Sequence, residues 1–300
     1  MKDHLLRFAT QDGTLRAAAA VTTDLVESLR QLQGTDPTAT VALGRLVSGA
    51  TIMGSLLKGD QKLALMIEGN GPLRKLHAET DASGHVRGSV QVPVSGIPPT
   101  ANGFDVPAAV GRAGFLHVSK DLGLKEPYRG MVQLYSGEIA EDLAYYLTTS
   151  EQVPSSVALG VYLEQDGRVA AAGGLLVQAL PGGQDALIEL LESRLVALPP
   201  LTTLLREGQD PEQILRHLFA DVPLGKAEKI PVTFRCNCHR GQIRALLKGL
   251  GKEELEALAG QEEATVVTCE FCQKKYSFSR QEIRQLRAEL LEMPGRTDSP

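Results

Sequence analysis

Alternating apolar and polar residues, the period of a half-buried strand, recur through the first 178 residues of the chain. The alternation is clearest at 62–68 and 86–92, and further strands are expected at 8–21 (with a turn at 11–13), 115–118, 131–134, 157–163 and 169–178. Helical spacing of apolar residues appears at 24–32, 38–57 and 138–147. Because strands come in runs with the helices set apart, we expect residues 1–178 to form a β-rich α+β domain with packed helices.

Segment 38–57 differs from the other predicted helices because it is apolar on nearly every side. It carries Gly44, Gly49 and Gly54 at intervals of five, and its composition resembles that of a membrane span. Arg45 and several hydroxyl residues argue against insertion into a bilayer, and the apolar segment ends at the polar residues that begin with Lys58. We therefore expect a helix buried within a soluble core, and no membrane partner.

A change of pattern at Pro181-Gly182-Gly183 marks the end of the first domain. An apolar leucine stripe at 187–198 stops at a pair of prolines, and Asp210-Pro211-Glu212-Gln213 provides a helix cap and a capping-box residue. These signals predict a linker over 179–230 that contains a pair of short amphipathic helices. Their apolar stripes require a partner surface, for which the β-rich domain is the obvious candidate.

The remaining chain predicts a small third unit over 231–294, followed by a disordered polar tail at 295–300. Helices are expected at 240–248 and 252–259, and short strands at 265–268 and 276–278. A last helix at 279–291 begins with the capping-box pair Ser279 and Glu282.

Composition narrows the possible functions. The chain has 300 residues, of which 43% are hydrophobic, and a formal net charge of −5, which argues against a general nucleic-acid binder. The start of the chain has no long apolar segment, so no signal peptide is expected. In a cytoplasmic setting, paired cysteines favour metal or redox chemistry over structural disulfides.

The four cysteines of the chain all lie in its last quarter, as Cys236-x-Cys238 and Cys269-x-x-Cys272 with 30 residues between the pairs. Buried cysteines often act only as small hydrophobes, but here all four occur in pairs at metal-ligand spacing. Four thiolates form a closed tetrahedral Zn²⁺ site with no open position for a substrate. We therefore expect one structural zinc ion per chain, because a unit of this size buries too little core to be stable without a metal or a cross-link.

Two other functions use the same residues. A zinc-ribbon nucleic-acid binder could stack bases on Phe234, Phe271, Tyr276 and Phe278, but residues 231–280 hold eight Lys/Arg and six Asp/Glu, so these aromatics are expected to form the small core. A thiol oxidoreductase could use Cys269 and Cys272, but no βαβ unit surrounds them. We find no catalytic constellation among the scattered histidines, so no enzyme is expected. These histidines are His4, His77, His85, His117 and His217.

Several motifs together resemble the redox-regulated 33-kDa heat-shock chaperone family of bacteria. They span essentially the whole chain: Gly69-Asn70-Gly71-Pro72-Leu73, Val86-Arg87-Gly88, Lys125-Glu126-Pro127-Tyr128-Arg129-Gly130, Ser150-Glu151-Gln152, Phe234-Arg235-Cys236-Asn237-Cys238 and Cys269-Glu270-Phe271-Cys272-Gln273-Lys274-Lys275-Tyr276. One departure is His239, where members often carry a small hydroxyl residue. A histidine here could stabilise a thiolate, coordinate transiently or have no role.

The resemblance implies a cytoplasmic chaperone that is inactive while reduced and zinc-bound, with a C-terminal redox-switch domain. Oxidation would pair Cys236 with Cys238 and Cys269 with Cys272 and release zinc. The C-terminal unit and linker would then unfold, and a homodimer would hold unfolded client proteins without using ATP. Disulfides that close such tiny loops stabilise by only about 2 kcal/mol each, against about 10–16 kcal/mol for structural zinc, which is consistent with unfolding on oxidation.

Overall fold

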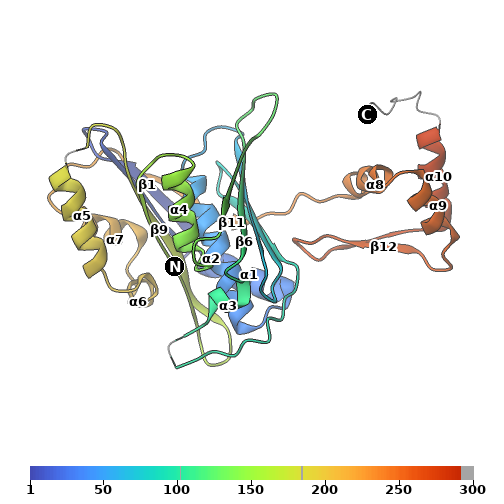
Figure 1. Ribbon diagram of the computed structural model, residues 1–300, viewed down its shortest axis with the longest axis horizontal. Coiled ribbons are helices and arrows are strands. Elements are labelled where there is room, and N and C mark those ends of the chain that lie inside the picture. The colour runs from blue at the N-terminus through green and yellow to red at the C-terminus, as the bar shows by residue number, and fades with distance from the viewer. Residues whose placement is uncertain (102, 184, 292–300) are drawn as a thin grey trace. The chain divides into compact units, whose positions relative to one another are not determined.

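The computed structural model describes residues 1–101, 103–183 and 185–291 (Figure 1). The chain forms two compact units, unit 1 from Met1 to Arg235 and unit 2 from Cys236 onward. Each combines strands with helices, so the α+β class expected from the sequence is confirmed. The predicted tail at 295–300 lies outside the described residues.

Unit 1 contains two sheets. The five-stranded sheet has the order β10-β1-β2-β9-β8 and is antiparallel throughout. The six-stranded sheet has the order β11-β5-β4-β3-β6-β7, with only the β11–β5 pair parallel. The strands are β1 His4–Ala9, β2 Leu15–Val21, β3 Lys62–Gly69, β4 Lys75–Asp81, β5 His85–Val90, β6 Gly114–Asp121, β7 Tyr128–Gln133, β8 Ser155–Leu163, β9 Val169–Ala179, β10 Glu228–Pro231 and β11 Thr233–Phe234.

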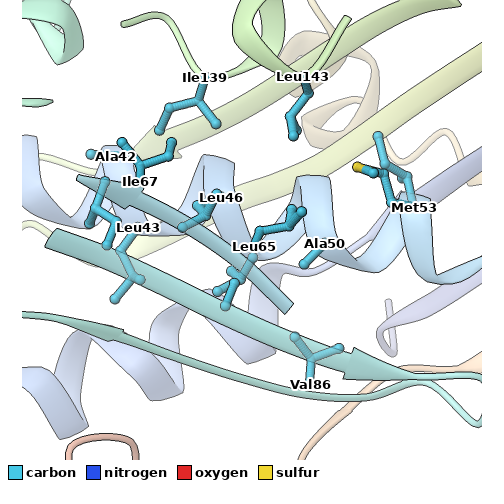
Figure 2. Close-up of a cluster of buried hydrophobic side chains, with 14 of the residues drawn as sticks. Ala42, Leu43, Leu46, Ala50, Met53, Leu65, Ile67, Val86, Ile139 and Leu143 are labelled. Atoms are coloured by element: carbon cyan, nitrogen blue, oxygen red, sulfur yellow. The ribbon is translucent and has the colours of Figure 1, made fainter. Parts of the chain in front are cut away.

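The two sheets share a core built on helix α2. The helices of unit 1 are α1 Thr23–Gln33, α2 Pro37–Gly54, α3 Val106–Val110, α4 Ala140–Thr149, α5 Asp185–Ala197, α6 Leu201–Arg206 and α7 Pro211–Leu218. Figure 2 shows Leu43, Leu46 and Ala50 of α2 packed among side chains of β3, β5 and α4. Residues Ala18 and Leu176 of the five-stranded sheet belong to the same buried cluster.

Burial on all sides explains the unusual composition of α2. The side chains of this helix are buried almost throughout, and Asp36 caps its N-terminus by accepting a hydrogen bond from the Ala39 amide at 2.8 Å. The predicted buried helix is therefore confirmed. Across the ranges that the structure describes, no helix is both long and apolar enough to cross a membrane.

The linker region contains three helices rather than the expected pair, because the six residues of α6 follow the two prolines directly. Capping of α7 by Asp210 and Gln213 is as predicted. Residues of α5 and α7, including Leu191 and Leu215, pack on Leu6, Phe8 and other residues of the five-stranded sheet. Figure 1 shows α5, α6 and α7 on the side of β9 away from α2, so their apolar stripes cover the outer face of this sheet.

The segment before the first cysteine pairs with both sheets of unit 1. Strand β10 lies beside β1, with Arg7 opposite Glu228, and β11 lies beside β5, with Phe234 opposite Val86. The Arg235 amide adds a hydrogen bond to the Val86 carbonyl at 3.1 Å. Residues 231–235, which we expected in the third unit, therefore pair within unit 1, and Phe234 packs against the unit 1 core instead of the small one.

Unit 2 is built from a hairpin and three helices. Its elements are α8 Arg240–Gly249, α9 Lys252–Gly260, β12 Thr265–Thr268, β13 Lys275–Phe278 and α10 Arg280–Leu291. Among the residues of unit 2 that the structure describes, the core cluster consists of eight, which are Ile243, Leu247, Leu255, Ala259, Tyr276, Phe278, Ile283 and Leu286. The Ser279–Glu282 capping box forms as predicted, with the Ser279 amide donating to Glu282 Oε2 at 2.9 Å. So small a core supplies little of the burial that a stable domain needs.

Candidate metal centre

The hairpin of unit 2 carries one pair of cysteines in its turn. The Cys269 amide donates to the Lys274 carbonyl at 3.0 Å, and the Gln273 amide donates to the Cys269 carbonyl at 2.9 Å. Gln273 adopts a left-handed conformation with φ of 58°, which bends the chain back into β13. This tight turn brings Cys269 and Cys272 to the same end of the hairpin.

The other pair lies in the segment that leads from β11 into α8. Cys236 and Cys238 are two residues apart, the spacing at which side chains of an extended segment share a face. His239 is extended (φ −146°, ψ 161°) and caps α8, because its Nδ1 accepts a hydrogen bond from the Gln242 amide at 3.2 Å. The exposed histidine therefore fixes the point at which the helix starts.

The fold brings all four cysteines together. Their Sγ atoms lie within 4.8 Å of one another. The Cys236 and Cys269 sulfurs are 3.7 Å apart, and those of Cys238 and Cys272 are 3.3 Å apart. Four sulfurs at about 2.3 Å around a tetrahedral Zn²⁺ would be separated by about 3.8 Å. The donor set and its spacing therefore fit a four-thiolate zinc ion.

Burial controls the chemistry of these thiols. Cys269 is buried and the other three are half-buried. Burial, with a smaller contribution from the neighbouring cysteine sulfurs, raises the pKa of the Cys272 thiol to about 12. A metal cation bound here would displace protons from the sulfurs, since the thiolate is the ligand form.

A tyrosine hydroxyl completes the immediate surroundings of the sulfurs. Tyr276 Oη lies 3.1 Å from Cys238 Sγ and donates to the Cys238 carbonyl at 2.9 Å. The contact with Cys238, together with burial, raises the pKa of Tyr276 to about 12. We had expected Tyr276 only as a core residue. Its place four residues after Cys272, at the far side of the hairpin turn, is the signal that could have indicated this second role.

The basic residues beside the cysteines have other partners. Arg240 donates to the Ser277 carbonyl at 2.8 Å and to Glu282 at 2.6 Å, and its guanidinium lies over the Phe278 ring. Lys274 lies over the Tyr276 ring, with its Nζ 5.4 Å from the ring centre. Arg235 belongs to unit 1, where its guanidinium is 3.2 Å from His85 Nε2. These contacts give Arg240, Lys274 and Arg235 structural roles, whether or not their charges also offset the negative charge of the thiolates.

The same geometry bears on the two alternative functions. Tyr276 and Phe278 are 6% and 1% exposed, so in this conformation neither offers a face on which a base could stack. Cys269 and Cys272 lie in the turn of a two-stranded antiparallel hairpin, whereas a thioredoxin-like motif opens a helix in a βαβ unit. Neither alternative gains support from the fold.

Comparison with known proteins identifies the family. The family model described as "Hsp33 protein" matches residues 3–279. The chain belongs to the Hsp33 family. A protein of Syntrophotalea carbinolica named "33 kDa chaperonin" is 72% identical over 288 residues, covering 96% of this chain and all of the relative. A Geobacter sulfurreducens protein of the same name is 50% identical over 96% of each chain.

A solved structure supports the same assignment. The crystal structure of the 33 kDa chaperonin of Thermotoga maritima, titled a heat shock protein 33 homolog, has a TM-score of 0.89 and 34% identity. The match covers 97% of this chain and 100% of that one. The family resemblance expected from the sequence is therefore confirmed. The chain is a member of a family of heat-shock chaperones, which are not enzymes.

Proposed function

We propose that this Hsp33-family protein is a redox-regulated holdase whose switch is the four-cysteine cluster of unit 2. Cys236, Cys238, Cys269 and Cys272 would hold one Zn²⁺ per chain in the reduced, inactive state. The observation that carries this proposal is the convergence of the four sulfurs within 4.8 Å in a unit whose described residues form a core cluster of eight. The bound ion would keep the sulfurs deprotonated and cross-link two segments that are far apart in sequence.

Oxidation would convert the four thiolates into two disulfides, Cys236–Cys238 and Cys269–Cys272. With a peroxide as oxidant, each pair of thiolates gives up two electrons and forms one S–S bond, and each hydrogen peroxide takes up two protons to become two waters. A disulfide sulfur is no longer a thiolate ligand, so the zinc ion is released.

Loss of the ion would then unfold the switch domain, 231–294, and the linker, 179–230. Structural zinc contributes about 10–16 kcal/mol to folding, while a disulfide across one or two intervening residues contributes about 2 kcal/mol. The exposed segments and the outer face of the five-stranded sheet would bind unfolded clients in the cytoplasm. The active form would be a homodimer that uses no ATP and binds no nucleic acid.

The decisive experiment measures zinc, thiols and chaperone activity in one sample before and after peroxide with mild heat. We expect one zinc and four free thiols per chain at the start, and neither after treatment. Suppression of client aggregation, followed by light scattering, should appear only in the treated sample. Mild heat without peroxide is the control and should leave all three readings unchanged. The switch is wrong if the reduced, zinc-loaded protein suppresses aggregation equally well.

Peptide mapping of the oxidised protein tests the pairing separately. The shortest sulfur separations given above cross between the two motifs, Cys236 to Cys269 and Cys238 to Cys272. The family resemblance implies disulfides within each motif, and these would leave the two segments free to separate. Crossed disulfides would keep the segments linked, and their recovery as the main product would contradict unfolding as the route to activity.

A further inference from the structure

A cavity of about 290 Å³ opens on the α2-facing side of the five-stranded sheet in unit 1. Its walls come from β1, β2 and β9, from the segment that directly follows α2 and from the segment that enters β10. Four cations line it, together with a single acid, and we call it the basic cavity. These charged residues are Arg7, Arg16, Lys58, Lys226 and Glu228.

Strand register explains why the charges converge. Arg7 lies opposite Ala18 on one side and Glu228 on the other, and Arg16 lies between Ala9 and Gln178. Since every second residue of a strand faces the same way, the positions of Arg7 and Arg16 form adjacent rows on one face of the sheet. The segment before β10 brings Lys226 beside the row of Arg16, because the Gly225 amide donates to the Ala9 carbonyl at 2.8 Å.

The hydrogen bonds show which charges are already neutralised. Arg7 donates to Glu228 Oε2 at 2.8 Å and to the carbonyls of Ser55 and Leu57, so this pair is satisfied within the protein. Arg16 uses Nε to donate to Gln178 Oε1 at 2.8 Å, and burial lowers the pKa of its guanidinium. The nearby acid, Glu151, is paired with Lys120.

Three cations therefore keep unneutralised charge at the basic cavity. Within the described ranges, no carboxylate forms an ion pair with Arg16, Lys58 or Lys226. Glu151 attracts the Arg16 guanidinium without forming an ion pair with it, and this carboxylate is already paired with Lys120. An anion that binds the partly desolvated guanidinium directly is therefore favoured.

Apart from Ser55 and Gln178, the rest of the lining is apolar. Leu56, Leu176 and Ala18 lie beside the charged groups. The volume lies just below the range of about 300–1,000 Å³ for small-molecule sites, which excludes a large ligand. A convergent set of polar groups beside an apolar wall is the arrangement that orients an amphipathic small molecule.

We propose that the basic cavity binds a small organic anion, with its oxyanion head group among Arg16, Lys58 and Lys226 and its short apolar body against Leu56 and Leu176. The site contains none of the cysteines, but Lys226 lies in the linker that the proposed switch unfolds, so the assignment is made for the reduced, zinc-loaded protein. A bound anion would connect the segment before β10 to strand β2 through Lys226.

The test uses the full-length, reduced, zinc-loaded protein and follows backbone amide NMR signals during titration with hexanoate. We expect saturable shifts at Arg16, Gln178 and Lys226 with a Kd of about 1 mM or lower. Hexanamide has the same apolar body without the charge, and inorganic phosphate has charge without the body. Each should bind at least about tenfold more weakly than hexanoate, since hexanamide lacks the charged head group and phosphate lacks the apolar body.

Charge-removing variants locate the head group. Arg16→Gln and Lys226→Gln should each weaken hexanoate binding about tenfold, the effect of losing one charge-assisted hydrogen bond. Lys125→Gln removes an exposed lysine of the β6–β7 loop and should leave the affinity unchanged. Lys226 lies on an exposed segment, so its variant decides the matter if Arg16→Gln fails to fold.

Three results would overturn the proposal. The first is the absence of saturable shifts at the cavity amides, and the second is equal binding of hexanoate and hexanamide. The third is unchanged affinity in Lys226→Gln. Equal binding of inorganic phosphate and hexanoate would overturn the organic part of the assignment, because it would show that the apolar wall is not used.

Discussion

His239 shows how a single side chain beside the cysteines acquires a local structural role. Its Nδ1 accepts the Gln242 amide proton and so occupies the position of a helix N-cap. Serine, threonine, aspartate and asparagine usually fill this position. The sequence left three roles open for His239: stabilising a thiolate, transient metal coordination or no role. The structure instead supports a fourth role, capping of α8, which was not predicted.

Replacing His239 tests this role. His239→Ala should destabilise zinc-loaded unit 2 by about 1 kcal/mol, because the first turn of α8 loses its cap. His239→Ser is the matched control, since it restores a capping oxygen and should recover the loss. Zinc content, measured by elemental analysis, should stay at one ion per chain in both variants. A zinc content below one in His239→Ala alone would instead show that the ring contributes to metal binding.

Glu27 is a second residue whose surroundings predict a measurable effect. Its carboxylate accepts two hydrogen bonds from Arg30, at 2.9 and 2.7 Å, and one from the Val169 amide of β9 at 3.0 Å. The Arg30 side chain is the main reason that the pKa of Glu27 falls to about 2, below its ordinary 4.5. The residue therefore joins α1 to the five-stranded sheet in its charged form.

The sign of the pH effect follows from the lowered pKa. The stabilisation by Glu27 should be complete above about pH 4.5 and should disappear as the pH falls toward 2. In urea unfolding of unit 1, Glu27→Gln should cost about 2–3 kcal/mol at pH 7 and progressively less at pH 4 and 3. Glu189→Gln, at an exposed position of α5, should cost little at any pH. A cost in Glu27→Gln that did not change with pH would contradict the ionic explanation.

At the scale of elements, the glycines of α2 set how closely its neighbours pack. A Cβ built at Gly44 would lie 2.7 Å from methyl groups of both Val26 and Val161. A Cβ at Gly49 would meet Leu143 at 2.5 Å, and one at Gly54 would meet Thr80 at 2.9 Å. The interval of five that was visible in the sequence thus corresponds to close approaches by α1, α4 and both sheets.

Gly44→Ala should therefore destabilise unit 1 despite the better helix propensity of alanine. Propensity favours the substitution by about 1 kcal/mol, but overpacking against two stiff valines costs about 1–3 kcal/mol, and we expect a net loss of up to about 2 kcal/mol. Gly249→Ala at the end of α8 meets no atom within 4 Å and should be neutral or slightly stabilising. Thermal unfolding of the zinc-loaded proteins gives both values. Equal stability of Gly44→Ala and the unmodified protein would show that Val26 and Val161 can shift to accommodate the added methyl group at little cost.

Elements with strong local signals were predictable, and those defined by distant partners were not. The β8–β9 hairpin, helix α2 and the capped helices α7 and α10 all carry clear periodicity or cap residues. Strand β4 reads Lys75-Leu-His-Ala-Glu-Thr-Asp, with too little apolar content to indicate a strand before its neighbours are known. Helices α3 and α6 have five and six residues, too few for a helical period to appear.

At the scale of the whole molecule, unit 1 and unit 2 differ in how much core each possesses. The unit 1 core joins both sheets and α2, whereas the core of unit 2 has eight residues beside the cysteine cluster. The cysteine spacing made the candidate metal site predictable from sequence. The division of the chain at Arg235 was not predictable, because the pairing of β10 with β1 joins residues more than 200 positions apart.

Zinc removal should therefore separate the behaviour of the two units. A strong chelator under reducing conditions should make residues 236–291 of unit 2 sensitive to protease while residues 1–178 of unit 1 remain resistant. Mass spectrometry of the fragments gives the cleavage sites, and added zinc should restore protection. Chelator already saturated with zinc is the control and should leave protection intact. Persistent resistance of 236–291 without metal would show that the eight-residue core suffices for folding.

The short stretch from Glu228 to Phe234 completes both sheets of unit 1, as the outermost strand next to β1 and then as the outermost strand next to β5. If this stretch detaches, two rows of backbone amides and carbonyls lose their partners at the same moment. Open rows of this kind can pair with any extended polypeptide, whatever its side chains. One peptide segment would then determine whether β1 and β5 stay covered or become two further sequence-independent docking edges.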